Sequence, residues 1–142
     1  MSGLIDFDID IEHKFERDLW AYLGRVARAL GVGQESCSVD LDVPVSAYIA
    51  LDWRVDRYPD RDLALLWHEV HGWAAAVEAS CGEDMLVLAY LGGPEVLPDP
   101  RAVVRLIAEL RAEEHPVGCA EPPVLREPGY HHELIDCHRP SR

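Results

Sequence analysis

Hydrophobic positions near the start of the chain recur every three or four residues, a spacing that places one apolar stripe on an α-helix. The stripe falls within residues 10–30 and consists of Ile11, Phe15, Leu19, Leu23, Val26 and Leu30. Asp8 or Asp10 is placed to cap the start of this helix, and Gly31 is placed to close it in a left-handed conformation. The pattern therefore predicts an N-terminal amphipathic helix.

Between residues 38 and 91 the period changes to two, and β-branched and aromatic residues alternate between clusters of turn-forming residues. We expect five short strands, at residues 38–41, 47–53, 63–69, 73–79 and 85–91. The third and fourth strands flank Val70-His71-Gly72, a loop that places glycine at its last, left-handed position. The fifth is an uninterrupted apolar run, which is typical of a central strand buried on both faces.

After the strands, Pro98-Asp99-Pro100 supplies a helix N-cap followed by proline at the first helical position, and this second helix is expected to stop before Pro116. The remaining residues are rich in proline and histidine. We predict an α+β fold with an N-terminal helix, a five-stranded antiparallel meander sheet, a C-terminal helix and an irregular tail. Residues 1–114 would form a single domain, and residues 115–142 an irregular or disordered tail.

Composition and charge narrow the class of protein. The chain has 142 residues, 49% of them hydrophobic, which suits one compact domain. Its formal net charge of -13 argues against binding to nucleic acid or to anionic lipid. No apolar run approaches the roughly 20 residues that a membrane span requires. We expect a cytoplasmic protein whose four cysteines are reduced thiols.

Most of the negative charge lies in the predicted sheet region. Residues 33–100 carry 13 acids and three arginines, a net charge of -10. Four of these acids are closely spaced between the second and third strands, at Asp52, Asp56, Asp60 and Asp62. The simplest interpretation is a solvated surface that keeps the protein soluble, and the alternative is a docking site for a basic protein segment.

Aromatic residues are the second set of candidates for partner binding. Trp67 and Trp73 fall on the large-residue face of the predicted hairpin, and Trp53 ends the preceding strand. With Tyr48 or Tyr90 nearby they would wall a ligand pocket, although large aromatics on a sheet more often belong to a core or to a dimer interface. Both sheet faces are apolar and only two helices are available to cover them, so we predict a homodimer.

Metal-binding chemistry has weak support. His68 and His71 are separated by three positions in a hairpin, whereas a zinc-protease motif needs histidines four apart on a helix, so we expect their side chains to point to different places. The tail holds the only dense set of transition-metal ligand types, with His131, His132, Cys137 and His138 as weak candidates. No metal site is favoured and no cofactor is expected.

Four stretches of the chain resemble a family of small uncharacterised actinobacterial proteins, a domain of unknown function. They read LDVPVSAYIAL at 41–51, PDRDLALLW at 59–67, HGWA at 71–74 and LAYLGG at 88–93. The likeness covers roughly residues 15–112. It implies a cytoplasmic protein from a high-GC bacterium and supplies no catalytic residues.

No recognisable motif pairs a nucleophile with a base, so we do not expect an enzyme. The sequence favours a non-catalytic regulatory or protein-interaction module. The alternative is a small-molecule- or metal-responsive binding protein that uses the tryptophan-bearing sheet face or the histidine and cysteine tail.

Overall fold

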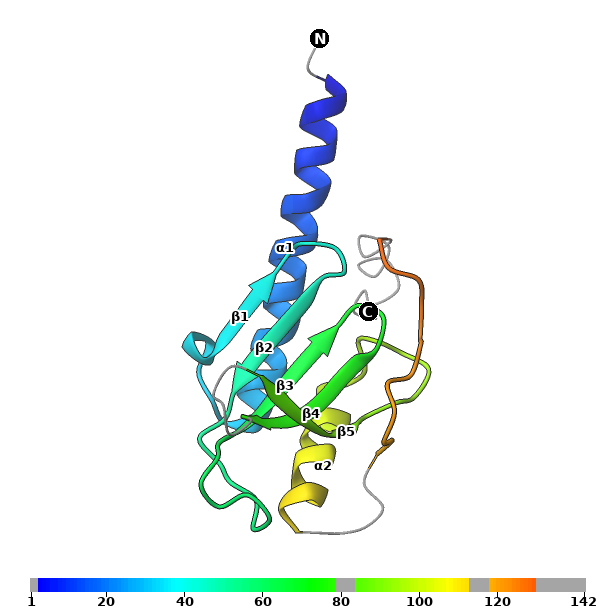
Figure 1. Ribbon diagram of the computed structural model, residues 1–142. Coiled ribbons are helices and arrows are strands. Elements are labelled where there is room, and N and C mark those ends of the chain that lie inside the picture. The colour runs from blue at the N-terminus through cyan, green and yellow to red at the C-terminus, as the bar shows by residue number, and fades with distance from the viewer. Residues whose placement is uncertain (1–2, 79–83, 113–117, 130–142) are drawn as a thin grey trace.

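The computed structural model describes residues 3–78, 84–112 and 118–129 (Figure 1). It has the predicted α+β architecture, with one five-stranded antiparallel sheet between two helices in chain order. The elements are α1 (Gly3–Leu30), a short 3-10 helix η1 (Gln34–Ser36), β1 (Cys37–Asp40), β2 (Ser46–Ala50), β3 (Leu63–His68), β4 (Gly72–Glu78), β5 (Met85–Tyr90) and α2 (Pro100–Arg111).

Helix α1 begins at Gly3, earlier than its apolar stripe indicates. Asp8 and Asp10 therefore lie inside the helix, and the prediction that one of them is the N-cap is wrong. The C-terminal end agrees with the sequence: Gly31 has a φ of 83° and the backbone N–H of Val32 donates to Ala27 O at 2.9 Å. The left-handed glycine thus closes the last turn without a steric cost to a side chain.

Helix α2 starts where the local sequence predicts. Asp99 is its N-cap, with a side-chain oxygen that accepts a hydrogen bond from the Arg101 backbone N–H at 2.9 Å, and Pro100 is the first helical residue. Val103, Leu106 and Ile107 form its buried face.

The strands lie in the order β1-β2-β3-β4-β5, so each pairs with its neighbour in the chain. Strand β5 is consequently an edge strand, and the expectation of a central strand buried on both faces is wrong. Of its six residues only Ala89 is buried. Its outer edge is met in part by Cys119, which exchanges two backbone hydrogen bonds with Tyr90 at 2.7 and 2.8 Å.

The hairpin between β3 and β4 turns one residue earlier than expected. His68 pairs with Gly72, so the three-residue loop is Glu69-Val70-His71, and the left-handed glycine, with a φ of 72°, is the first residue of β4. Trp67 therefore lies opposite Trp73, whereas a loop formed by residues 70–72 would have placed it opposite Ala75. Moving the loop by one residue shifts the partner of each β3 residue by two positions. Because side chains alternate with a period of two, each one stays on the face that the alternation predicts.

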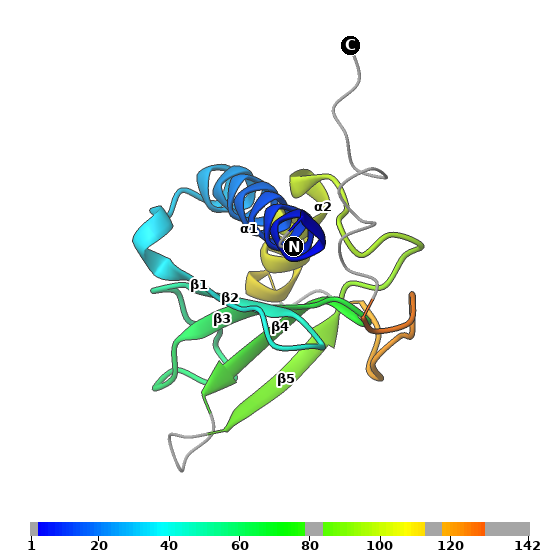
Figure 2. The same cartoon turned by 90° about the horizontal axis from the view of Figure 1, so that it is seen from above.

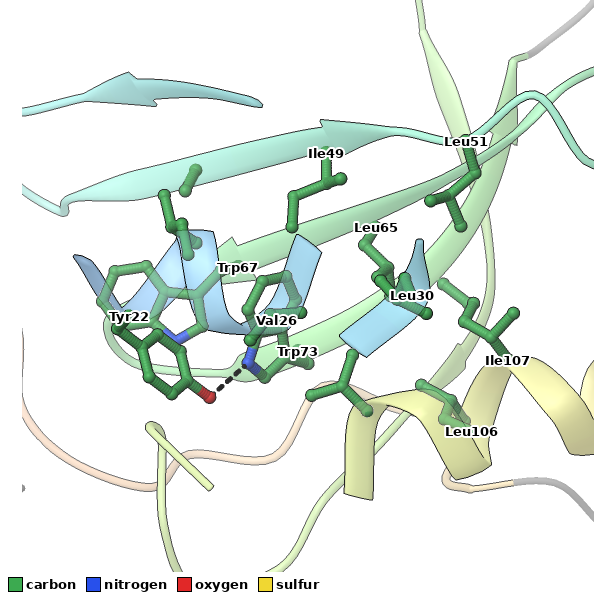
Figure 3. Close-up of a cluster of buried hydrophobic side chains, with 14 of the residues drawn as sticks. Tyr22, Val26, Leu30, Ile49, Leu51, Leu65, Trp67, Trp73, Leu106 and Ile107 are labelled. Atoms are coloured by element: carbon green, nitrogen blue, oxygen red, sulfur yellow. Dashed lines mark hydrogen bonds between the residues drawn. The ribbon is translucent and has the colours of Figure 1, made fainter. Parts of the chain in front are cut away.

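Both helices pack on the same face of the sheet (Figure 2). The core lies between them and the sheet (Figure 3) and includes the large side chains Phe15, Tyr22, Leu65, Trp67 and Trp73. The buried polar atoms here are paired within the chain. Trp73 Nε1 donates to Tyr22 Oη at 3.1 Å, Tyr22 Oη donates to Pro98 O at 2.7 Å, and Trp67 Nε1 donates to Val96 O at 2.6 Å.

Residues 118–129, which we call the strap, run along the β5 side of the sheet without regular secondary structure (Figure 1). The strap is docked: Leu125 packs against the core, and its N–H donates to Val70 O at 2.8 Å. The division into a domain of residues 1–114 and a tail remains a prediction, and this part of the tail is irregular but attached to the sheet.

Candidate functional site

The sheet face opposite the helices, which we call the open face, is not covered by any helix of the described chain (Figure 2). Alternation along the strands assigns its residues, and the strand register places them side by side. Its central members are Ser46, Tyr48, Leu66, His68, Ala74 and Tyr90. Tyr48, Leu66 and Tyr90 are half-buried, so this face is apolar yet accessible.

The open face is hollowed. A hollow of about 380 Å³ lies over strands β1 to β5, with Tyr48, Leu66, Ala74 and Val87 among its apolar lining. The small side chain of Ala74 lies between Leu66 and Tyr90 and leaves the space above it open. The volume lies within the range of about 300–1,000 Å³ typical of small-molecule sites.

Two acidic residues lie on the open face, and we call them the acidic border, although only one of them lines the hollow. The strands carry no lysine or arginine. Asp40 lines the hollow from the end of β1, and Glu78, at the end of β4, is exposed on the same face. Burial raises the pKa of the Tyr48 hydroxyl, and the charges of Glu78 and Asp62 raise it further. The open face therefore combines an apolar floor with two acidic side chains and no basic residue in its strands.

His68 and His71 form the polar end of the hollow. Their imidazole rings are stacked, with centroids 4.4 Å apart and planes inclined by 25°. The expectation that these side chains point to different places is wrong, because the tight loop brings the end of β3 beside the residue that precedes β4. Burial, and then the neighbouring His71, lower the pKa of His68, while Glu69 acts in the opposite direction.

Glu69, between the two histidines, anchors the strap. Its side chain is fully buried, and one carboxylate oxygen accepts from the Val45 N–H at 2.7 Å. The other accepts from Arg126 Nη1 and from the Gly129 N–H, both at 3.1 Å. One carboxylate thus ties the hairpin loop to both the β1–β2 loop and the strap. Because buried charges need such partners, Glu69 is a structural residue of the site.

Two of the three tryptophans considered for partner binding are core residues. Trp67 and Trp73 are 1% exposed and point toward the helices (Figure 3), which fits the alternative that they belong to the core. Trp53 is half-buried against the same core, with the guanidinium carbon of Arg111 4.7 Å from the centre of its ring. Tyr48 and Tyr90, the other aromatics considered for a pocket, do line the hollow on the opposite face.

The acidic loop is separate from the hollow. Asp52, Asp56 and Asp60 are exposed, whereas Asp62 pairs with Arg54 at 3.0 Å. Arg57 and Arg61 lie over the ring of Tyr58, at 5.6 and 5.7 Å from its centre. Three arginines are therefore interspersed with four acids, and a role of this loop in binding a partner remains a prediction.

The weak metal candidates His131, His132, Cys137 and His138 lie outside the described residues. Within the described ranges, no group of three or more histidine, cysteine or acidic side chains is arranged to hold a metal ion. The helices of the same ranges include none with the length and apolar character needed to cross a membrane.

The chain belongs to DUF6292, a family of unknown function, whose sequence profile matches residues 22–109. The match includes the whole sheet and most of α2, and therefore the hollow and both stacked histidines. No curated protein matches the chain, and no solved structure does.

Proposed function

We propose that the protein is a non-catalytic protein-interaction module whose open face binds a partner segment carrying apolar and basic side chains. The observation that carries the proposal is the hollow of about 380 Å³, which has an apolar floor and Asp40 in its lining, in a sheet whose strands carry no basic residue. Apolar side chains would enter the hollow, and lysine or arginine would face Asp40 and Glu78. Electrostatic complementarity of this kind favours basic partners and rejects acidic ones.

The hydrogen bonds of His68 favour binding over hydrolysis. Asp40, Ser46 and His68 lie in a row across β1, β2 and β3, and they are the residue types of a hydrolase triad. His68 Nδ1 accepts from the Val70 N–H at 3.0 Å, so in the neutral ring Nε2 carries the proton. A ring nitrogen that already carries a proton cannot take one from serine, so this row lacks the base that acyl transfer needs.

A homodimer is the alternative occupant of the open face. The sequence predicts one because the apolar area of the sheet exceeds what two helices cover, and the described open face is such an area. Two copies in face-to-face contact would, however, bring two acidic borders together, which opposes self-association. A small molecule is a second alternative, favoured by the volume of the hollow.

The experiment is a selection of peptides from a random display library on the purified protein at low salt. We expect enrichment of peptides that combine apolar residues with lysine or arginine, and affinity that falls as ionic strength rises. Leu66→Glu, within the hollow, should abolish binding. The matched control is Leu86→Glu, at an exposed leucine that does not line the hollow.

Three outcomes would contradict the proposal. The first is enrichment of acidic peptides, the second is equal binding by both variants, and the third is no enrichment at all. A wild-type dimer in light scattering that Leu66→Glu converts to a monomer would assign the open face to a second copy.

We place this activity in the cytoplasm of an actinobacterium, as the sequence predicts. Cys37 and Cys119, the free cysteines of the described residues, are in keeping with a reducing compartment. Cell fractionation of the source organism checks the location, and recovery outside the cytoplasm would contradict it.

A further inference from the structure

The hydrogen bonds of the two stacked histidines show which ring nitrogens are used within the described chain and which remain for a ligand. A backbone N–H can only donate, so His68 Nδ1, 3.0 Å from the Val70 nitrogen, must accept. The proton of neutral His68 is then on Nε2, at the far side of the ring from the loop. His68 therefore offers a donor.

His71 has the opposite arrangement. Its Nδ1 lies 2.8 Å from the carbonyl oxygen of Pro123 in the strap, and a carbonyl oxygen can only accept. His71 Nδ1 must carry the proton, and in the neutral ring Nε2 is left with a lone pair. His71 therefore offers an acceptor, and the docked strap is what holds it in this tautomer.

One donor and one acceptor thus lie on adjacent rings at one end of an apolar hollow. A carboxylate would satisfy His68 and face the lone pair of His71, whereas an ammonium would satisfy His71 and face the N–H of His68. A neutral group that both accepts and donates satisfies both rings. Such a group should bind more tightly than either ion, because each ion leaves one ring nitrogen without a hydrogen bond, which is costly.

The stacking geometry favours a group with two separate polar atoms. Hydrogen bonds to imidazole lie close to the ring plane, and these two planes are nearly parallel, inclined by 25°. A single hydroxyl oxygen would have to leave one plane to meet both nitrogens. A primary carboxamide carries its oxygen and its nitrogen on one carbon, so each of the two atoms lies nearer to one ring plane than a single shared oxygen would.

We propose that His68 and His71 bind a primary carboxamide, supplied by an asparagine or glutamine side chain of the segment that occupies the open face. The inference rests on the proposed function and adds a specificity element to it. The carboxamide oxygen accepts from His68 Nε2, and the carboxamide nitrogen donates to His71 Nε2. Basic residues of the segment then face Asp40, in the same row as His68, and Glu78, at the opposite end of β4.

The test uses small probes that share one apolar body, so it does not depend on finding the partner. The probes are 4-phenylbutanamide, its N,N-dimethyl derivative and 4-phenylbutan-1-ol, titrated at pH 7.5 and followed by amide chemical shifts around Ser46, His68 and His71. We expect the primary amide to bind about tenfold more tightly than the dimethyl amide, since the dimethyl amide has no N–H to donate and leaves His71 Nε2 without a partner.

Two variants remove one ligand contact each and keep the loop contacts. His68→Asn retains an acceptor for the Val70 N–H, and His71→Asn retains a donor for Pro123 O. Each should abolish the preference for the primary amide, whereas His13→Asn, at an exposed position on α1, should leave it unchanged. If one variant fails to fold, the other still decides the matter.

Equal affinity for the three probes, a preference for the alcohol, or a preference that survives both variants would overturn the carboxamide site. Failure of the peptide selection with an intact amide preference would instead overturn the proposed function alone. In that case the preference belongs to a small amide ligand.

Discussion

The two faces of the sheet are built from neighbouring residues of the same strands, yet they differ in what they leave available. Leu65 is fully buried beneath the helices, and Leu66, the next residue, is half-buried on the open face. On the covered face, the indole nitrogens of Trp67 and Trp73 both donate within the chain. On the open face, Nε2 of His68 and of His71 makes no hydrogen bond to the described residues.

This difference separates stability from recognition. The covered face consists of large side chains with paired polar atoms, which is how a core gains stability. The open face combines alanines, tyrosines and two histidines with polar atoms still available, which is how a binding site gains specificity. Substitutions on the two faces should therefore have different consequences, and the following measurements test that contrast.

The largest contrast is expected from the same substitution at adjacent positions. Leu65→Ala should lower the free energy of unfolding by about 2–5 kcal/mol, because it leaves a cavity in a packed core. Leu66→Ala should cost about 1 kcal/mol, since its side chain is only half-buried. Urea denaturation of both variants gives the comparison, and equal costs would show that the open face is covered in solution.

The connection between the faces depends on Glu69. Glu69→Gln should lower the free energy of unfolding by about 1–3 kcal/mol. The carboxylate oxygen that accepts from Arg126 and from the Gly129 N–H is replaced by an amide nitrogen, which can only donate. Glu127→Gln, at an exposed strap position, is the matched control and should have no measurable effect. Protease cleavage within the strap should become faster only in Glu69→Gln. Unchanged cleavage would contradict the anchoring role.

Two tyrosines extend the comparison to single hydroxyl groups. Tyr22→Phe should cost about 1–2 kcal/mol, since Trp73 Nε1 and Pro98 O both lose a partner on the covered face. Tyr48→Phe, on the open face, should leave stability within about 0.5 kcal/mol. Thermal denaturation separates the two. A cost for Tyr48→Phe as large as that for Tyr22→Phe would remove the distinction between the faces.

Local signals in the sequence predicted the helices and the faces of the strands. Asp99 caps α2 with its own side chain, and the alternation around Leu65 and Leu66 assigns each to its face whatever the pairing. The start of α1 was missed because aspartates such as Asp8 favour helix starts without requiring them. The hairpin was placed one residue late because a left-handed Gly72 fits both a loop and the first residue of a strand.

The site was less predictable because it depends on contacts between distant segments. Glu69 collects partners that are 24, 57 and 60 residues away in the chain, and no local pattern marks them. The tautomer of His71 is set by Pro123, 52 residues away. The alternation did indicate a second apolar face, but the sequence alone directed attention to the tryptophans on the other side.

The smallest expected effect is a pH dependence that comes from the open face alone. The pKa of His68 in the folded protein lies below its ordinary value of 6.5, chiefly through burial. Above that value both the folded and the unfolded chain hold a neutral ring, so His68 contributes nothing to the pH dependence. As the pH falls below 6.5 the unfolded chain takes up a proton first, and the free energy of unfolding decreases until the folded ring is protonated too.

His68→Asn removes this titration and keeps the acceptor for the Val70 N–H, so its urea midpoint should fall less between pH 7.5 and pH 5.5 than that of the wild type. His13→Asn, on the exposed side of α1, should follow the wild type. If the wild type and His68→Asn lose stability in parallel, His68 is as readily protonated in the folded chain as in the unfolded one. The His68 ring would then not be held in its neutral form. The assignment of His68 as a donor and His71 as an acceptor would fail as well.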